Sequence, residues 1–122
     1  MKDFHNLKVW ERAHSLTLAL YKVTQNFPKG ELYGLTSQIR RSSSSIPMNI
    51  AEGCGRDSQA EMTHFFLIAM GSSSELEYQI ILAHDLQYLE ENEFNELSSE
   101  LTEVRRMLNA YIQKLKSTLP KK

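Results

Sequence analysis

Two short stretches carry acidic and histidine side chains at the spacing of metal ligands. Residues 11–14 (ERAH) and 61–64 (EMTH) both have the pattern E-x-x-H within segments that are predicted to be helical. Di-metal carboxylate bundles use two such motifs and a glutamate from each remaining helix, all facing inward. The helical phase argues against this site, because Glu11 lies about 200° around the helix from the apolar Val9. We therefore predict no bound metal and no cofactor, and keep a di-metal carboxylate bundle as a remote alternative.

A run of four serines, residues 42–45, raises the question of nucleophilic catalysis. A serine nucleophile needs an adjacent base and an oxyanion hole, usually on a strained turn. The sequence has no G-x-S-x-G motif, and His84 and Asp85 are direct neighbours, which places them about 100° apart around a helix. We predict that the protein has no catalytic residues and is not an enzyme.

The serine run is better explained by the close packing of two helices. Residues 42–45 and a second small cluster, residues 71–74 (GSSS), fall near the middles of their predicted helices. Pro47 lacks an N–H, so it should kink its helix and free the carbonyl of Ser43, which nearby serine hydroxyls could satisfy. Polar groups in such a crossing are costly if they are buried without partners. We therefore predict a polar network across the two helices, formed by Ser45, Asn49, Glu52, Ser72 and Glu75.

Apolar residues recur at steps of three and four along most of the chain, which predicts helices. Asn6 and Asn92 are predicted helix caps, Ser58 and Glu61 form a predicted capping box, and Pro120 is a predicted stop. Short links join the segments, so neighbouring helices should be antiparallel. The sequence predicts an all-α, up-down-up-down four-helix bundle in a single domain over residues 1–122, with helices at about 7–27, 35–53, 58–89 and 92–119.

The composition fits a soluble protein of the cytoplasm. Hydrophobic residues make up 41% and charged residues 24% of the chain, and five glycines and three prolines are few for an all-β fold. Cys54 is the single cysteine, so no internal disulfide can form. There is neither a signal-peptide pattern nor an apolar run long enough to span a membrane. We expect a cytoplasmic location and no membrane partner.

The charge is unevenly distributed along the chain. The net charge is −1, but residues 1–60 hold eight Lys and Arg against five Asp and Glu, and residues 61–122 hold six against ten. The first half therefore offers a candidate contact surface for RNA or DNA, at Lys8, Arg12, Lys22, Lys29, Arg40 and Arg41. Large apolar residues outside the helical stripes are candidates for a subunit interface. They are Trp10, Leu18, Tyr21 and Tyr78.

Several short motifs together resemble a known family. They are Phe4, Leu7, the pair at 9–10 (VW), the pair at 27–28 (FP), the stretches at 33–35 (YGL), 38–41 (QIRR), 45–47 (SIP) and 49–53 (NIAEG), and finally residues 71–72 (GS) with Glu75. The sequence resembles bacterial four-helix bundle proteins encoded by intervening sequences within 23S ribosomal RNA genes, the S23-type proteins. The resemblance covers about residues 4–115. It departs from the family pattern at Met48, where serine is common, and at residues 42–44, where alanines are usual.

The resemblance implies a ring-like homopentamer. It also implies kinship with the accessory protein of diversity-generating retroelements, a pentamer that binds a reverse transcriptase and nucleic acid. Our main prediction is a non-enzymatic homo-oligomer with a scaffold or accessory role, whose partner is itself. The alternative is an RNA- or DNA-binding accessory protein that uses the basic surface of the first two helices, because five copies in a ring would multiply a modest basic patch.

Overall fold

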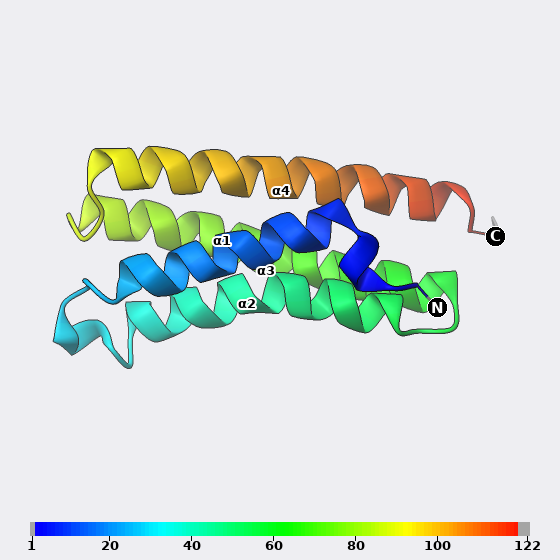
Figure 1. Ribbon diagram of the computed structural model, residues 1–122, viewed down its shortest axis with the longest axis horizontal. Coiled ribbons are helices and arrows are strands. Elements are labelled where there is room, and N and C mark those ends of the chain that lie inside the picture. The colour runs from blue at the N-terminus through cyan, green and yellow to red at the C-terminus, as the bar shows by residue number, and fades with distance from the viewer. Residues whose placement is uncertain (1, 120–122) are drawn as a thin grey trace.

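The protein is an antiparallel bundle of four long helices, as predicted (Figure 1). The structure is a computed structural model, and it describes residues 2–119. Short 3-10 helices, η1 (Phe4–Asn6) and η2 (Lys29–Glu31), lie before α1 and between α1 and α2. The long helices are α1 (Lys8–Thr24), α2 (Leu35–Cys54), α3 (Gln59–Asp85) and α4 (Glu91–Ser117).

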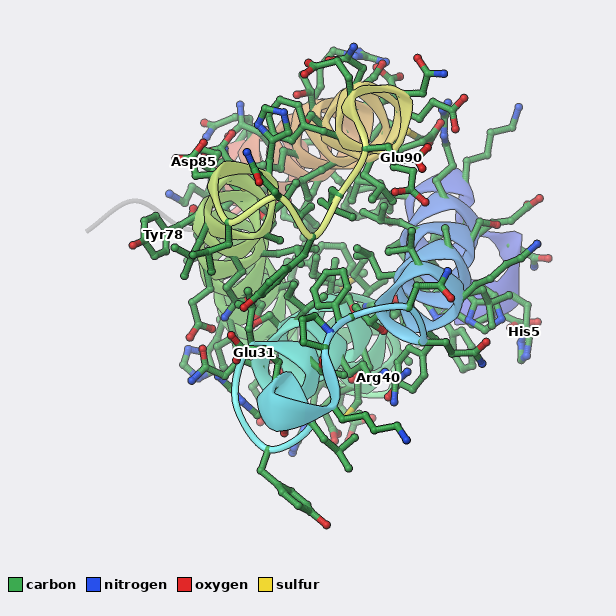
Figure 2. The ribbon with its side chains drawn as sticks, turned by 90° about the vertical axis from the view of Figure 1, so that its left-hand side faces the viewer. His5, Glu31, Arg40, Tyr78, Asp85 and Glu90 are labelled. Atoms are coloured by element: carbon green, nitrogen blue, oxygen red, sulfur yellow. The ribbon has the colours of Figure 1, made fainter. Side chains whose placement is uncertain are left out.

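The four helices stand at the corners of a square when the bundle is viewed along its axis (Figure 2). Each helix packs against the next helix in the chain, and α1 also packs against α4. The backbones of the diagonal pairs, α1 with α3 and α2 with α4, stay more than 8 Å apart between Cα atoms within residues 2–119. The most extensive contact is the one between α2 and α3. The outer faces of α1 and α3 therefore point in different directions.

One continuous apolar core runs along the inside of the bundle. It includes Ile39 and Ile50 of α2, Phe66 of α3 and Leu108 of α4, all with almost no exposed surface. Complete burial of a side chain of this size contributes roughly 1.5–3 kcal/mol. The core thus accounts for the apolar periodicity of three and four residues in each helix.

Two helices are shorter at their C-terminal ends than the apolar pattern suggests. α1 ends at Thr24, and Phe27 is buried in the turn that follows, with its N–H bonded to the Thr24 carbonyl at 3.1 Å. α3 ends at Asp85 because Gln87 adopts a positive φ of 66°. The Tyr88 N–H then donates to the carbonyl of Ala83 at 2.9 Å, which is the bond of a Schellman motif.

The helix starts follow the predicted capping chemistry in one case and differ in two. The Ser58 side chain accepts a hydrogen bond from the Glu61 N–H at 3.1 Å and caps α3 as expected, but the Glu61 carboxylate accepts from the Ser58 hydroxyl at 3.3 Å, so only half of the predicted capping box forms. α4 begins two residues earlier than an Asn92 cap would allow, because Glu90 and Glu93 form a capping box. Leu7, not Asn6, precedes α1, and no side chain caps that helix. Pro120 lies outside the described residues.

No helix within the described part of the chain is both long enough and apolar enough to cross a membrane.

Candidate functional site

Small residues line the contact between α2 and α3. Ser42, Ser43 and Ser73 are fully buried, and the Oγ atoms of Ser45 and Ser72 lie 2.8 Å apart across the two helices. Near the end of α2, a Cβ atom on Gly53 would lie 3.0 Å from the Phe66 ring. The small side chains therefore allow the two helix backbones to approach each other closely along the length of α2.

The five residues of the predicted polar network divide into three groups. The Asn49 side-chain amide donates to the Ser45 carbonyl at 2.8 Å and to its Oγ at 3.0 Å, which joins Asn49 to the Ser45–Ser72 contact. Glu75 instead pairs with Arg41 at 3.3 Å, and Glu52 pairs with Arg56 at 3.3 Å. The separation has a physical reason: the two carboxylates are exposed, where long arginine side chains reach them, while the hydroxyls and the amide are at least half-buried.

The carbonyl that Pro47 frees finds its partner on another helix. α2 continues through Pro47, which leaves the Ser43 carbonyl without a helical N–H. The hydroxyl of Thr17, on α1, lies 2.9 Å from this carbonyl oxygen, and its one proton is shared with the Ala13 carbonyl of its own helix, which is also at 2.9 Å. The sequence pointed instead to nearby serines, but the Ser44 hydroxyl donates to the Arg40 carbonyl at 2.8 Å. The sequence did not identify Thr17 as the partner of this carbonyl, because Thr17 flanks the apolar stripe of α1. Its place beside that stripe was the only available signal that its hydroxyl faces another helix.

The six predicted nucleic-acid contacts do not form a single free patch. The three lysines, Lys8, Lys22 and Lys29, are exposed. Arg12 donates to both carboxylate oxygens of Glu100 and so connects α1 to α4. Arg41 is paired with Glu75, as described above. Two of the three arginines are thus already engaged by carboxylates of the acidic half of the chain.

Arg40 lies between α1 and α2 at the surface (Figure 2). Its guanidinium stacks 4.9 Å from the centre of the Tyr21 ring, and its Nε donates to the Thr24 hydroxyl at 3.0 Å. A hollow of about 460 Å³ opens beside it. Tyr33 at the rim of this hollow is 94% exposed. The lining residues are Tyr21, Leu32, Tyr33, Thr36, Ser37, Arg40 and Arg41.

The four predicted interface residues belong to two different surfaces. Trp10 is half-buried and stacks on His14, with 5.1 Å between the ring centres, at a groove of about 410 Å³ between α1 and α2. Leu18, which is 58% exposed, and Tyr21 line the same groove. Tyr78 points away from the bundle on α3, at a different corner, and is 62% exposed (Figure 2).

Seven further exposed apolar residues were missed by sequence reasoning. Leu32 and Tyr33 precede α2, Met48 lines the groove beside α1, Leu67, Ile68 and Ile81 lie on α3, and Leu86 follows α3. The available signal was that α3 carries apolar residues on all sides, which is unusual for a helix with one face toward solvent. The apolar residues of α3 that face the core already accounted for its helical periodicity, so the exposed apolar residues were not recognised as a second group.

The E-x-x-H motifs and the serine run have other partners. His14 stacks on Trp10, and Glu61 belongs to the cap of α3. His84 contacts Glu91 at 3.0 Å and stacks on a ring of α4, far along α3 from the serine crossing. Among residues 2–119, no group of three or more His, Cys, Asp or Glu side chains is placed to hold a metal ion.

Cys54, at the end of α2, is the remaining nucleophilic side chain. It is 1% exposed, and burial raises the pKa of its thiol above the ordinary value. A thiol that is buried and protonated is a poor nucleophile, because the thiolate is the reactive form. Cys54 therefore acts as a core residue in this structure.

These features define a class of protein: an antiparallel four-helix bundle whose second and third helices cross on serine and glycine. The sequence model of the 23S rRNA-intervening sequence protein family matches residues 5–110. The chain belongs to this family.

The fold is similar to that of a solved relative. The crystal structure of a protein with unknown function from the S23 ribosomal protein family of Bacteroides thetaiotaomicron VPI-5482, at 1.70 Å resolution, superposes with a TM-score of 0.77. The two sequences are 24% identical, and the match covers 85% of this chain and 97% of that one. Curated proteins give no match to the sequence. The likeness to this structure thus supports the four-helix fold.

Proposed function

We propose that the protein is a non-enzymatic homo-oligomer, a ring of five copies, with a scaffold or accessory role. The observation that carries the proposal is the outer face of α3, where Leu67, Ile68, Tyr78 and Ile81 are all exposed. Large apolar side chains that gather on an exposed helix face favour an interaction site in soluble proteins. Family membership supports the same proposal, because the resemblance noted above implies a ring-like pentamer.

Sedimentation of the purified protein tests this proposal. A ring of five copies has a mass of about 70 kDa, five times the 14.1 kDa of one chain, and a closed ring keeps this mass across a wide range of protein concentration. A single species of one chain at all concentrations would refute assembly. A stable species of another size would retain the assembly and refute the number five.

RNA or DNA binding is a second candidate function. The observation that favours it is the hollow beside Arg40, where the exposed Tyr33 ring and two arginines surround an open space. Single-stranded nucleic acid binds to such combinations, because bases stack on aromatic rings and phosphates contact arginines. Repetition of the hollow around a ring would strengthen weak individual contacts.

Fluorescence anisotropy with a labelled single-stranded RNA, and with a DNA of the same sequence, tests this second function. The variants Tyr33→Ala and Arg41→Glu should each weaken binding several-fold at physiological salt. Arg12→Glu is the matched control, because it makes the same charge change at an arginine that is also paired with a carboxylate but lies outside the hollow. Wild-type affinity after replacement of both Arg40 and Arg41 by glutamate would exclude this surface. Binding that is seen only at low salt would indicate nonspecific attraction.

A further inference from the structure

The outer face of α3 forms an apolar ridge, defined here as Leu67, Ile68, Tyr78 and Ile81. All four side chains are between 40% and 62% exposed. Their spacing places them along one side of the helix, over a length of roughly 20 Å. Gly71 lies between them, and within the described residues no atom beyond its own turn of helix lies within 4 Å of the place where its Cβ would be. The ridge is therefore long, and it has a low point at its centre.

A concave apolar surface lies elsewhere on the molecule, between α1 and α2. This groove has Thr17 and Pro47 at its buried base, and Leu18, Tyr21 and Met48 on its exposed walls. It is a shallow depression, open to solvent, with a volume of about 410 Å³. Among the residues that the structure describes, no acidic side chain lines it. The groove can therefore take apolar side chains from a partner without burying a charge of its own.

The charges of the helices on the two surfaces are complementary. α3 contains no Lys or Arg and has four carboxylates, at Glu61, Glu75, Glu77 and Asp85. α1 and α2 together contain five Lys and Arg, at residues 8, 12, 22, 40 and 41, against the two glutamates at 11 and 52. Some of these charges are already paired within the chain: Glu75 with Arg41, Glu77 with Arg105, and Arg12 with Glu100. Among the others, Asp85 follows Ile81 of the ridge by one helical turn, and Arg40 stacks on Tyr21 of the groove. Opposite charges around two apolar surfaces favour their association and set its orientation.

We propose that the ridge of one copy of this chain seats in the groove of the next copy. The inference rests on the proposed function and deepens it, because it identifies the two surfaces that meet. The ridge and the groove lie on different sides of the bundle (Figure 2), so one copy cannot join its own two surfaces. A two-fold symmetric contact pairs like with like, whereas ridge-in-groove contacts are head-to-tail and lead to a ring or an open chain.

Two single variants that each destroy one surface provide the test. Leu18→Glu places a charge in the groove and leaves the ridge intact, while Tyr78→Glu damages only the ridge. Both positions are exposed, so the fold should be retained, as circular dichroism can verify. Each variant alone should sediment as a single chain of 14.1 kDa. An equimolar mixture should form a dimer of about 28 kDa and nothing larger, because only one intact groove and one intact ridge remain.

The controls separate this inference from the proposed function. Tyr33→Glu adds the same charge at an exposed aromatic residue outside both surfaces, and should keep the wild-type mass. A wild-type protein that is itself a single chain would refute both the assembly and the pairing. A wild-type oligomer whose variants keep its mass, or whose variants fail to combine when mixed, would overturn the pairing alone.

Cross-linking provides a second readout that does not depend on disruptive variants. The single native cysteine, Cys54, is buried, so cysteines introduced as Leu18→Cys and Tyr78→Cys can be addressed separately. A short bifunctional maleimide should link the two variants to each other when they are mixed. Neither variant should cross-link efficiently alone. Strong cross-linking of Tyr78→Cys with itself would show that ridge meets ridge, and would overturn the proposal.

Discussion

The hydroxyl of Thr17 on α1 lies 2.9 Å from the carbonyl oxygen of Ser43 on α2, and it shares its one proton between this oxygen and the Ala13 carbonyl of its own helix, also at 2.9 Å. This carbonyl lies four residues before Pro47, and the proline has no N–H to offer it. Both Thr17 and Ser43 are buried, so water does not readily replace the bond. The contact allows a proline in the middle of a helix without leaving a buried carbonyl unpaired.

Replacement of Thr17 by valine should show how far the stability of the protein depends on this hydrogen bond. Thr17→Val keeps the shape of the side chain but removes the donor, and should lower the free energy of unfolding by about 1–3 kcal/mol. In a Pro47→Ala background the loss should be smaller, because the alanine N–H can bond to the Ser43 carbonyl. Urea unfolding of the four proteins at one fixed protein concentration gives the coupling energy, for which we expect about 1 kcal/mol.

Thr63→Val is the matched control for this cycle. Thr63 is also a buried threonine, but its hydroxyl donates only to the Gln59 carbonyl of its own helix, at 2.8 Å. Its replacement should change stability less than Thr17→Val does. Additive effects of Thr17→Val and Pro47→Ala would contradict the assignment of the hydroxyl to the freed carbonyl.

The size of residue 72 should control the packing of α2 against α3. Ser72→Ala removes the hydrogen bond to Ser45 and should lower the free energy of unfolding by about 0.5–1.5 kcal/mol. Ser72→Leu forces the helices apart and should lower it by a further 1–3 kcal/mol or so. Ser44→Ala is the control, because its hydroxyl bonds only within α2. Equal stability of the alanine and leucine variants in urea unfolding would show that the crossing is not tight.

The sequence was sufficient for the four helices and for the position of the crossing. Periodic apolar residues are a strong signal, because each of them must face the same core. The small residues around positions 45 and 72 also indicated the crossing, because a run of small side chains in the middle of a helix allows another helix to pack closely against it. Helical phase and spacing alone also led us to predict no metal site at the two E-x-x-H motifs and no catalytic site at the serine run.

The partners of individual polar groups could not be derived in the same way. Glu75 shares a region with Ser72, but whether it faces that hydroxyl or Arg41 depends on a small rotation of α3. The exposed ridge was similarly hidden, because Leu67 and Ile68 are as apolar as the core residues beside them. Periodicity identifies an apolar stripe but does not distinguish two stripes on one helix when both are apolar.

Gly53 should tolerate no side chain. A Cβ atom there would lie 3.0 Å from two atoms of the Phe66 ring and 3.1 Å from the Met62 carbonyl oxygen, and that ring is fully buried. We expect Gly53→Ala to lower the free energy of unfolding by about 1–3 kcal/mol. Gly55→Ala is the control two residues away, where the nearest atom is 3.5 Å distant and φ is −82°. It should be neutral or slightly stabilising. Thermal unfolding that ranks the two variants in the opposite order would refute the close contact.

The contact between Tyr88 and Glu31 should make stability depend on pH in the alkaline range. The Tyr88 hydroxyl donates to the Glu31 carboxylate at 2.9 Å, and this hydrogen bond, together with partial burial and the nearby negative charge, raises the pKa of Tyr88 above its ordinary value of 10.0. The folded protein therefore holds the phenol proton more tightly than the unfolded chain. Its contribution is present in full below about pH 10 and is lost as the pH rises through the pKa of the folded state.

Tyr88→Phe should remove this part of the pH dependence. The urea midpoint of the wild-type protein should fall more steeply than that of the variant between about pH 9 and about pH 11, because only the wild type has a proton to lose at this position. Glu31→Gln should have a similar effect, since a neutral amide does not repel the phenolate as a carboxylate does. Tyr78→Phe is the control, because Tyr78 is exposed on the ridge and has no carboxylate hydrogen-bonded to it in the described structure. Parallel midpoint curves for the wild-type protein and Tyr88→Phe would show that the hydrogen bond to Glu31 does not persist in solution.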